Sequence, residues 1–283
     1  MSGGWADWLR EGRFARMSEE EREEQLRLLG VVRDQVLDLA RLQPGDDVLD
    51  LGAGTGLLTF GAHERIGDGW VIAVDPEVDN LQELLRTAHG LEAAGISYLV
   101  GDAEVLPLPD ASVDAAVTRS VLMYVDDLAE AARELFRVLR PGGRLACYEP
   151  LNRRGTYLPT TVDWTPVGAD LAARVAAEWE AHAASSALMR LDEGALEGAL
   201  RDAGFADVSV EVGERDEPWI VDERSAAARL DAVGAAGEPS LRERWARTFA
   251  PHEVELLVTH VGSLAGTTLT FRRAEAWVSA TRP

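Results

Sequence analysis

The chain has 283 residues and a formal net charge of −21, from 28 basic residues, all of them arginine, and 49 acidic ones. Such an acidic surface repels the phosphate backbone of nucleic acids, so no nucleic-acid partner is expected. The single cysteine, Cys147, excludes an internal disulfide and a cysteine-rich metal cluster, and no metal site is predicted. Hydrophobic residues make up 46% of the chain, enough to bury a sizeable core.

The amino-terminal residues carry charges where a secretory signal peptide has an apolar region. The sequence also lacks an apolar run of about 18 residues, the length that a membrane-spanning helix needs. These features predict a cytoplasmic protein without membrane association.

Strands and helices are predicted to alternate along most of the chain. After helices within residues 1–43 and a turn at 43–46, strands are expected at 47–51, 70–75, 96–100, 113–118 and 144–149, and helices at 57–66, 78–94 and 127–139. Further on, helices are expected at 169–180, 192–203, 223–235 and 252–264, and strands at 206–214 and 267–279. The alternation predicts an α/β fold: a Rossmann-like, seven-stranded, mostly parallel sheet with helices on both faces.

A glycine-rich loop, V-L-D-L-G-A-G-T-G at 48–56, follows the first predicted strand. The chain has no lysine, which excludes the phosphate-binding P-loop. A dinucleotide loop requires a third glycine where Leu57 stands. Asp50 precedes the first glycine by two residues, which is unfavourable near a pyrophosphate and favourable near a cationic ligand.

Four more motifs follow the loop in a regular order. They are the strand-ending Asp75 in V-I-A-V-D-P-E, the segment G-D-A-E-V-L-P-L-P-D at 101–110, T-R-S-V-L-M-Y at 118–124 and V-L-R-P-G-G-R-L at 138–145. With the glycine loop, these motifs resemble those of class I S-adenosylmethionine-dependent methyltransferases, of the bacterial type that modifies small molecules or peptides. The resemblance covers residues 40–150 strongly and 196–211 moderately.

The resemblance implies S-adenosylmethionine as cofactor and assigns roles to individual residues. Asp75 would bridge the ribose hydroxyls, and Asp102 would meet the adenine amino group. Glycines let the backbone approach the ligand closely. The residues assigned to the cofactor are Asp50, Gly52, Ala53, Gly54, Gly56, Asp75, Pro76, Asp102, Ala103 and Arg119.

In methyl transfer the cofactor carries the reactivity, and the protein mainly positions the acceptor. We expect the acceptor to be an oxygen atom of a small metabolite or a modified peptide. It would be a carboxylate held by Arg119 or Arg153, or a hydroxyl deprotonated by a histidine. The candidate catalytic residues are Arg119, Tyr124 and His260.

Three alternatives stay open from the sequence. They are methyl transfer to nitrogen, a non-catalytic module that only binds the cofactor, and a nicotinamide-dependent oxidoreductase, against which Leu57 argues. The nucleic-acid and glutamine methylation motif [DNS]-P-P-Y is absent after the fourth predicted strand. The sequence makes no prediction of the oligomeric state.

Four regions are predicted: a helical cap at 1–43, a cofactor-binding core at 44–215, a helical insert at 216–264 that would cover the acceptor, and the last core strand within 265–283. Aromatic residues in the cap and the insert would either roof an acceptor pocket or pack these helices on the sheet. They are Trp5, Trp8, Phe14, Trp219, Trp245 and Phe249.

Overall fold

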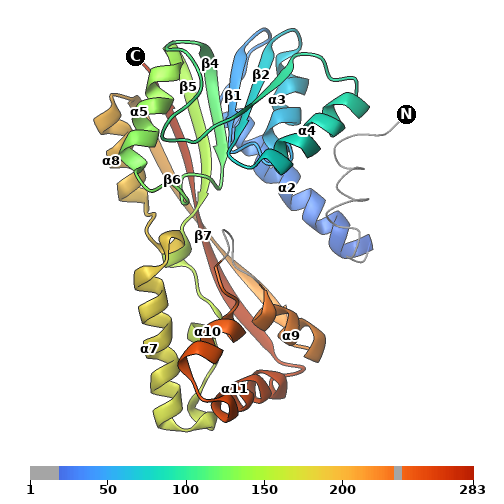
Figure 1. Ribbon diagram of the computed structural model, residues 1–283, viewed down its shortest axis with the longest axis vertical. Coiled ribbons are helices and arrows are strands. Elements are labelled where there is room, and N and C mark those ends of the chain that lie inside the picture. The colour runs from blue at the N-terminus through green and yellow to red at the C-terminus, as the bar shows by residue number, and fades with distance from the viewer. Residues whose placement is uncertain (1–18, 233–237) are drawn as a thin grey trace. The chain divides into compact units, whose positions relative to one another are not determined.

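The computed structural model describes residues 19–232 and 238–283 (Figure 1). The chain divides into two compact units. Unit 1 takes in the described part of Met1–Pro150 together with Asp192–Val212 and Glu275–Pro283, and unit 2 takes in the described part of Leu151–Leu191 and Gly213–Ala274. Within the described residues, no helix combines the length and apolar character needed to cross a membrane.

A seven-stranded sheet has the order β3-β2-β1-β4-β5-β7-β6. Its strands are β1 Asp47–Leu51, β2 Trp70–Asp75, β3 Ile96–Val100, β4 Val113–Arg119, β5 Leu139–Pro150, β6 Ala206–Ile220 and β7 Thr268–Thr281. The strands from β3 to β5 are paired in parallel, whereas β7 runs antiparallel to β5. The predicted α/β class with a mostly parallel sheet is therefore confirmed.

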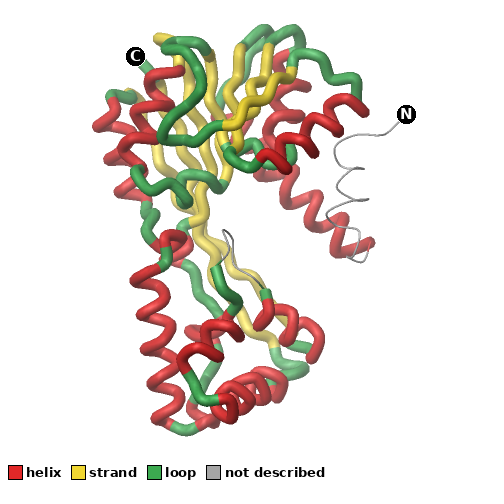
Figure 2. Tube along the Cα trace, in the orientation of Figure 1, coloured by secondary structure: helices red, strands yellow, loops and turns green. Residues whose placement is uncertain are grey.

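Helices cover both faces of the sheet in unit 1, as Figures 1 and 2 show. One face carries α2 (Glu19–Leu39), α3 (Leu57–Ile66) and α4 (Val78–Gly90), and the other carries α5 (Leu128–Val138) and α8 (Glu193–Ala203). The last turns of α2 and the buried side of α3 share one apolar cluster with strand residues, among them Val36, Leu37, Leu58, Val48 and Val117. Cys147 is fully buried, as expected of a core residue.

The strand order reverses between β1 and β4, because the chain proceeds outward from β1 to β3 and then returns to β4 on the opposite side. In open parallel sheets, ligands bind at such a reversal, outside the carboxyl ends of the two strands. The loops that follow β1 and β4 therefore bound the place where a ligand is expected.

Element boundaries in unit 1 agree closely with the predictions, and β5 is the main exception. It begins at Leu139, although the strand is predicted only at 144–149, after a helix at 127–139. The backbone explains the difference: Gly142 N–H donates to the Arg282 carbonyl at 2.8 Å, and Arg282 N–H donates to the Gly143 carbonyl at 2.9 Å. Pairing with the end of the chain thus extends the strand through a sequence that by itself favours a turn.

Unit 2 has its own core. Its helices are α6 Leu158–Thr161, α7 Ala169–Ser185, α9 Glu223–Asp231, α10 Leu241–Thr248 and α11 Pro251–Ser263, with short 3₁₀ turns at Asn152–Arg154, Thr165–Val167 and Ala187–Met189. Residues 151–191 were predicted to belong to the core at 44–215. They belong to unit 2 because their apolar side chains, including Trp164, Leu171 and Val175, share one cluster with those of residues 219–271.

The aromatic residues of the predicted insert pack inside unit 2 instead of lining an open pocket. Trp219, Trp245 and Phe249 are all buried, and the rings of Trp164 and Trp245 meet edge to face, with their centroids 5.5 Å apart. Of the two interpretations for these residues, the structure supports packing. Trp5, Trp8 and Phe14 lie outside the described residues.

Candidate active site

The glycine loop makes a tight turn between β1 and α3. Gly52, Gly54 and Gly56 have φ angles of +67°, +53° and +100°, a region that side-chain-bearing residues rarely adopt. A Cβ on Gly52 would overlap Cγ2 of Val121, in the loop after β4, whereas a Cβ on Gly54 would meet no atom within 4 Å. The loop thus packs against its neighbour at Gly52 and leaves open space at Gly54.

A buried carboxylate, Asp75, holds the glycine loop from the side of β2. Its Oδ2 accepts the Gly54 N–H at 2.8 Å, and its Oδ1 accepts the Glu77 N–H at 2.9 Å and Asn80 Nδ2 at 3.1 Å. A carboxylate can accept about four hydrogen bonds, so one acceptor position is left for a ligand hydroxyl. This geometry fits the predicted ribose contact, and Pro76, which follows, is exposed.

Asp50, two residues before the first glycine of the loop, is almost completely buried. Its side chain is 1% exposed, and its Oδ2 accepts the hydroxyl proton of Thr59 on α3 at 2.5 Å. Burial, with a smaller contribution from the nearby Asp75 charge, raises the pKa of Asp50 to about 7 against the opposing effect of hydrogen bonds from Thr59. A cationic ligand nearby would favour the ionised form, which is consistent with a sulfonium cofactor.

A second buried carboxylate, Glu149 at the end of β5, holds the loop after β4. Glu149 is 0% exposed. Its Oε1 accepts the Val121 and Leu122 N–H groups, each at 2.9 Å, and its Oε2 accepts the Met123 N–H at 3.3 Å. Burial raises the pKa of Glu149 to about 7, while these hydrogen bonds and the positive charge of Arg119 lower it.

The segment after β3 is connected to the same region. Asp102 is exposed, and its Oδ1 accepts the Glu104 N–H at 2.9 Å, which shapes a short turn, whereas Ala103 is buried. Glu104 in turn accepts the Asp126 and Asp127 N–H groups at 2.7 and 2.8 Å. Hydrogen bonds therefore link the turn assigned to adenine binding to the chain that follows β4.

Two of the candidate catalytic residues lie at the carboxyl end of β4 or just beyond it. Arg119 ends β4 and is paired in register with Tyr148; the Arg119 guanidinium carbon lies 5.9 Å from the centre of the Tyr148 ring. Tyr124 is 39% exposed, and its N–H donates to the Val121 carbonyl at 2.9 Å. Their roles at an acceptor stay predictions.

His260, the third candidate, belongs to unit 2, which contains none of the residues assigned to the cofactor. It lies on α11, where Nε2 is 2.7 Å from the Asp163 carbonyl oxygen, and its ring is 5.5 Å from that of Trp164. A carbonyl only accepts, so Nε2 carries the proton and donates it. These contacts hold the ring within unit 2, and the role of His260 at an acceptor stays a prediction.

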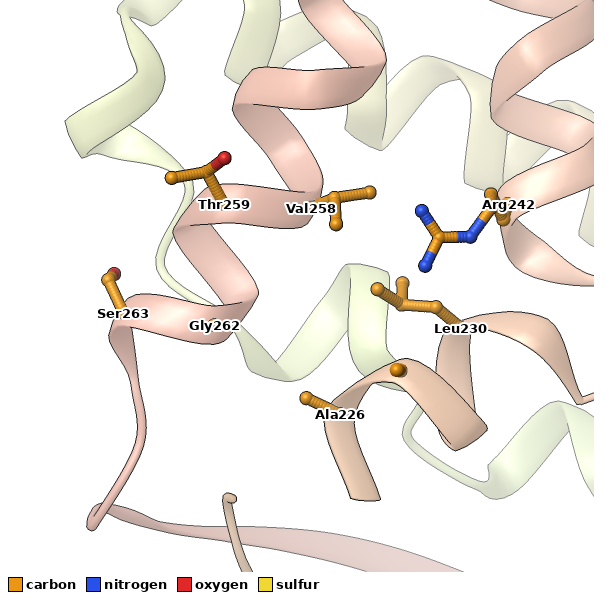
Figure 3. Close-up of a pocket in the computed structure, with 8 residues that line it drawn as sticks. Ala226, Leu230, Arg242, Val258, Thr259, Gly262 and Ser263 are labelled. Atoms are coloured by element: carbon orange, nitrogen blue, oxygen red, sulfur yellow. The ribbon is translucent and has the colours of Figure 1, made fainter. Parts of the chain in front are cut away.

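A cavity of about 410 Å³ opens within unit 2 between α9, α10 and α11 (Figure 3). Among the described residues that line it, Arg242 carries a charge and is paired with Asp231 at 2.5 Å. The other lining residues are small or apolar: Ala226, Ala227, Leu230, Val258, Thr259, Gly262 and Ser263. None of the residues predicted for the cofactor or for catalysis lines this cavity.

Comparison with known proteins identifies the family. A family model described as a methyltransferase domain matches residues 49–147. The ubiquinone/menaquinone biosynthesis C-methyltransferase UbiE of Vibrio campbellii is 35% identical over 180 residues, which cover 60% of this chain and 68% of the relative. The chain belongs to the class I S-adenosylmethionine-dependent methyltransferases. Its cofactor is S-adenosylmethionine, and the glycine loop with Asp75 fits that ligand.

Solved structures agree on the fold of this methyltransferase. Geranyl diphosphate methyltransferase in complex with its cofactor matches 93% of this chain and 90% of its own, with a TM-score of 0.53 and 20% identity. The [4+2]-cyclase SpnF matches 90% of this chain and 81% of its own, with a TM-score of 0.52 and 20% identity. Because a cyclase shares the fold, the activity rests on the sequence relatives.

Sequence analysis gave no role to four residues that shape the methyltransferase site: Thr59, Asn80, Val121 and Glu149. Asn80 and Thr59 lie on helices and reach Asp75 and Asp50 across turns. The signal for Glu149 was available, since it is an acidic residue at the end of an apolar strand, but its partners were not. They lie 26 to 28 residues earlier in the chain.

Gly52→Ala is expected to destabilise the methyltransferase strongly. The new Cβ would overlap Val121 while the backbone keeps a left-handed φ, so the free energy of unfolding should fall by about 2–4 kcal/mol. Gly54→Ala is the matched control: its φ is similar but the space is open, and it should lose only about 1–2 kcal/mol. Urea unfolding without cofactor measures both variants, and equal losses would contradict the contact with Val121.

Asp75→Asn is expected to weaken cofactor binding by about 1–3 kcal/mol, or roughly 5- to 150-fold in Kd. An amide nitrogen cannot accept the Gly54 or Glu77 N–H group, and its dipole is a weaker partner for ribose hydroxyls. Asp79→Asn, an exposed change in the first turn of α4, should leave Kd within about twofold. Calorimetric titration with S-adenosylmethionine compares them, and an unchanged Kd for Asp75→Asn would exclude the ribose role.

Asp50→Asn is expected to change how stability depends on pH. The folded protein holds the Asp50 proton up to a pKa of about 7, whereas the unfolded chain releases it near pH 4. The contribution of Asp50 to the free energy of unfolding therefore decreases as pH rises from about 4 to 7. The variant lacks this loss and should gain stability relative to the wild type between pH 5 and pH 8 in urea unfolding. Parallel pH profiles would contradict the raised pKa.

Proposed function

We propose that this methyltransferase transfers a methyl group to a ring carbon of a phenol- or quinol-type small molecule. The observation that carries the proposal is the 35% identity, over 60% of the chain, to a relative described as a ubiquinone/menaquinone C-methyltransferase. The sequence-based expectation was an oxygen acceptor, and the relatives favour carbon.

The chemistry suits a site that mainly positions its substrates. Loss of the phenol proton makes the ring carbon beside the oxygen electron-rich, and this carbon attacks the methyl group in line with the departing sulfur. A carbon–carbon bond forms as the carbon–sulfur bond breaks, S-adenosylhomocysteine leaves as a neutral thioether, and the ring proton passes to solvent. Alignment of the two reactants supplies most of the acceleration.

Arg119 is the residue we assign to the acceptor. It ends β4, beside the point where the strand order reverses, and its charge would stabilise a phenolate oxygen as the ring attacks. The same charge would also hold a carboxylate acceptor, so the position of the transferred methyl group distinguishes the two.

The test uses the purified full chain, methyl-¹³C-labelled S-adenosylmethionine, and a panel of demethylated quinols, simple phenols, aryl carboxylates and amines. The carbon-13 spectrum of the product distinguishes methyl groups on carbon, oxygen and nitrogen. Methyl transfer to a ring carbon of a quinol or phenol is expected, and Arg119→Ala should lower kcat at least about tenfold with saturating cofactor.

Arg201→Ala serves as the control, because this exposed arginine on α8 donates hydrogen bonds to its helix neighbour Glu197 and to the Val208 carbonyl, both remote in sequence from the residues assigned to the cofactor. Its turnover should match that of the wild type. Transfer to oxygen or nitrogen alone, or no transfer to any quinol or phenol by protein that binds the cofactor, would overturn the proposed acceptor class. Full activity of Arg119→Ala would remove Arg119 from the site.

A further inference from the structure

The loop after β4 has an unusual conformation that a carboxylate sustains. Ser120 has a φ of +56°, which is strained for a residue with a side chain, and its N–H donates to the Tyr148 carbonyl at 2.8 Å. The next three N–H groups, those of Val121, Leu122 and Met123, all point to the one carboxylate of Glu149. The chain thus turns sharply at the end of β4 and is held there.

This held segment borders the place where a ligand is expected, outside the carboxyl ends of β1 and β4. The side chain of Val121 occupies the space directly beside Gly52, where any Cβ would overlap it. Gly52 and Val121 follow β1 and β4, the two strands between which the order reverses. Glu149 thus fixes the position of Val121, which contacts the glycine loop, although Glu149 itself does not belong to that loop.

The glycine loop, on the other side of this contact, is held in a similar way. Asp75 accepts the Gly54 N–H, so the glycine loop is fixed from β2 while the Val121 segment is fixed from β5. Burying a carboxylate is costly unless hydrogen bonds compensate, and in both cases backbone N–H groups do so. A binding site whose backbone is ordered before the ligand arrives loses less conformational entropy on binding.

We propose that Glu149 is a positioning residue for cofactor binding, because it fixes Val121–Met123 so that Val121 forms a preordered wall against Gly52. Glu149 does not touch the reacting atoms. This inference goes beyond the proposed function, since it concerns cofactor affinity and holds whatever the acceptor is.

The proposal predicts an energetic coupling between Glu149 and Val121. Glu149→Gln keeps the shape, and its amide oxygen can still accept two N–H groups, but its NH₂ would oppose the Met123 N–H. We expect this variant to raise the Kd for S-adenosylmethionine about tenfold, measured by calorimetry. In a Val121→Ala background, where the wall is already lost, the same change should raise Kd less than about threefold.

Asp114→Asn is the matched control. Asp114 Oδ2 accepts the Asp47 N–H at 2.9 Å, so this carboxylate also holds backbone, but at the amino-terminal ends of β1 and β4. Its replacement should lower the melting temperature and leave Kd within about twofold. Comparison with this control therefore distinguishes a general loss of stability from a loss of the Val121 contact.

The double-mutant cycle of Glu149→Gln and Val121→Ala tests whether the two residues act together on cofactor affinity. A Kd within twofold of wild type for Glu149→Gln would overturn the proposal, and so would effects of Glu149→Gln and Val121→Ala that simply multiply. Should Glu149→Gln not fold, Glu149→Asp keeps the charge, withdraws the carboxylate by one methylene group, and enters the same cycle with the same expected coupling.

Discussion

Hydrogen bonds from backbone N–H groups to buried carboxylates hold the ligand-binding edge of this methyltransferase. Asp75 binds the loop that follows β1, and Glu149 binds the loop that follows β4. The first loop contains three glycines with positive φ, which glycine adopts readily, and the second contains Ser120, for which a positive φ is strained. Since the strand order reverses between β1 and β4, the side chains that hold both loops come from the strands on either side, β2 and β5.

The same arrangement explains why two carboxyl groups with raised pKa values are tolerated in the interior. Asp50 and Glu149 both have a pKa of about 7, chiefly because of burial. Asp50 has one hydroxyl partner, whereas Glu149 has three N–H partners, so the two groups lose different amounts of hydrogen bonding when they are protonated. A sulfonium ligand near these groups would shift both toward their ionised forms.

Much of unit 1 could be predicted because its determinants are local. Alternating apolar strands and amphipathic helices define the sheet, and the glycine loop, Asp75 and the 101–110 segment lie within about 60 residues of one another. Unit 2 was harder to predict. Its core joins residues 158–175 to 219–271, and nothing in the sequence between them indicates that they meet. The contacts of His260 could not be predicted for the same reason, because its partners at 163 and 164 are remote in the chain.

The sequence by itself determined the family, the α/β class and the cofactor, because a glycine-rich loop and strand-end carboxylates at fixed spacing are local signals. Only the tertiary structure decided which residues hold the site in shape. Val121 meets Gly52, Glu149 meets Val121, and Arg282 extends β5, all through contacts between segments far apart in the chain. Such contacts depend on how strands are ordered in the sheet, a property that no single segment encodes.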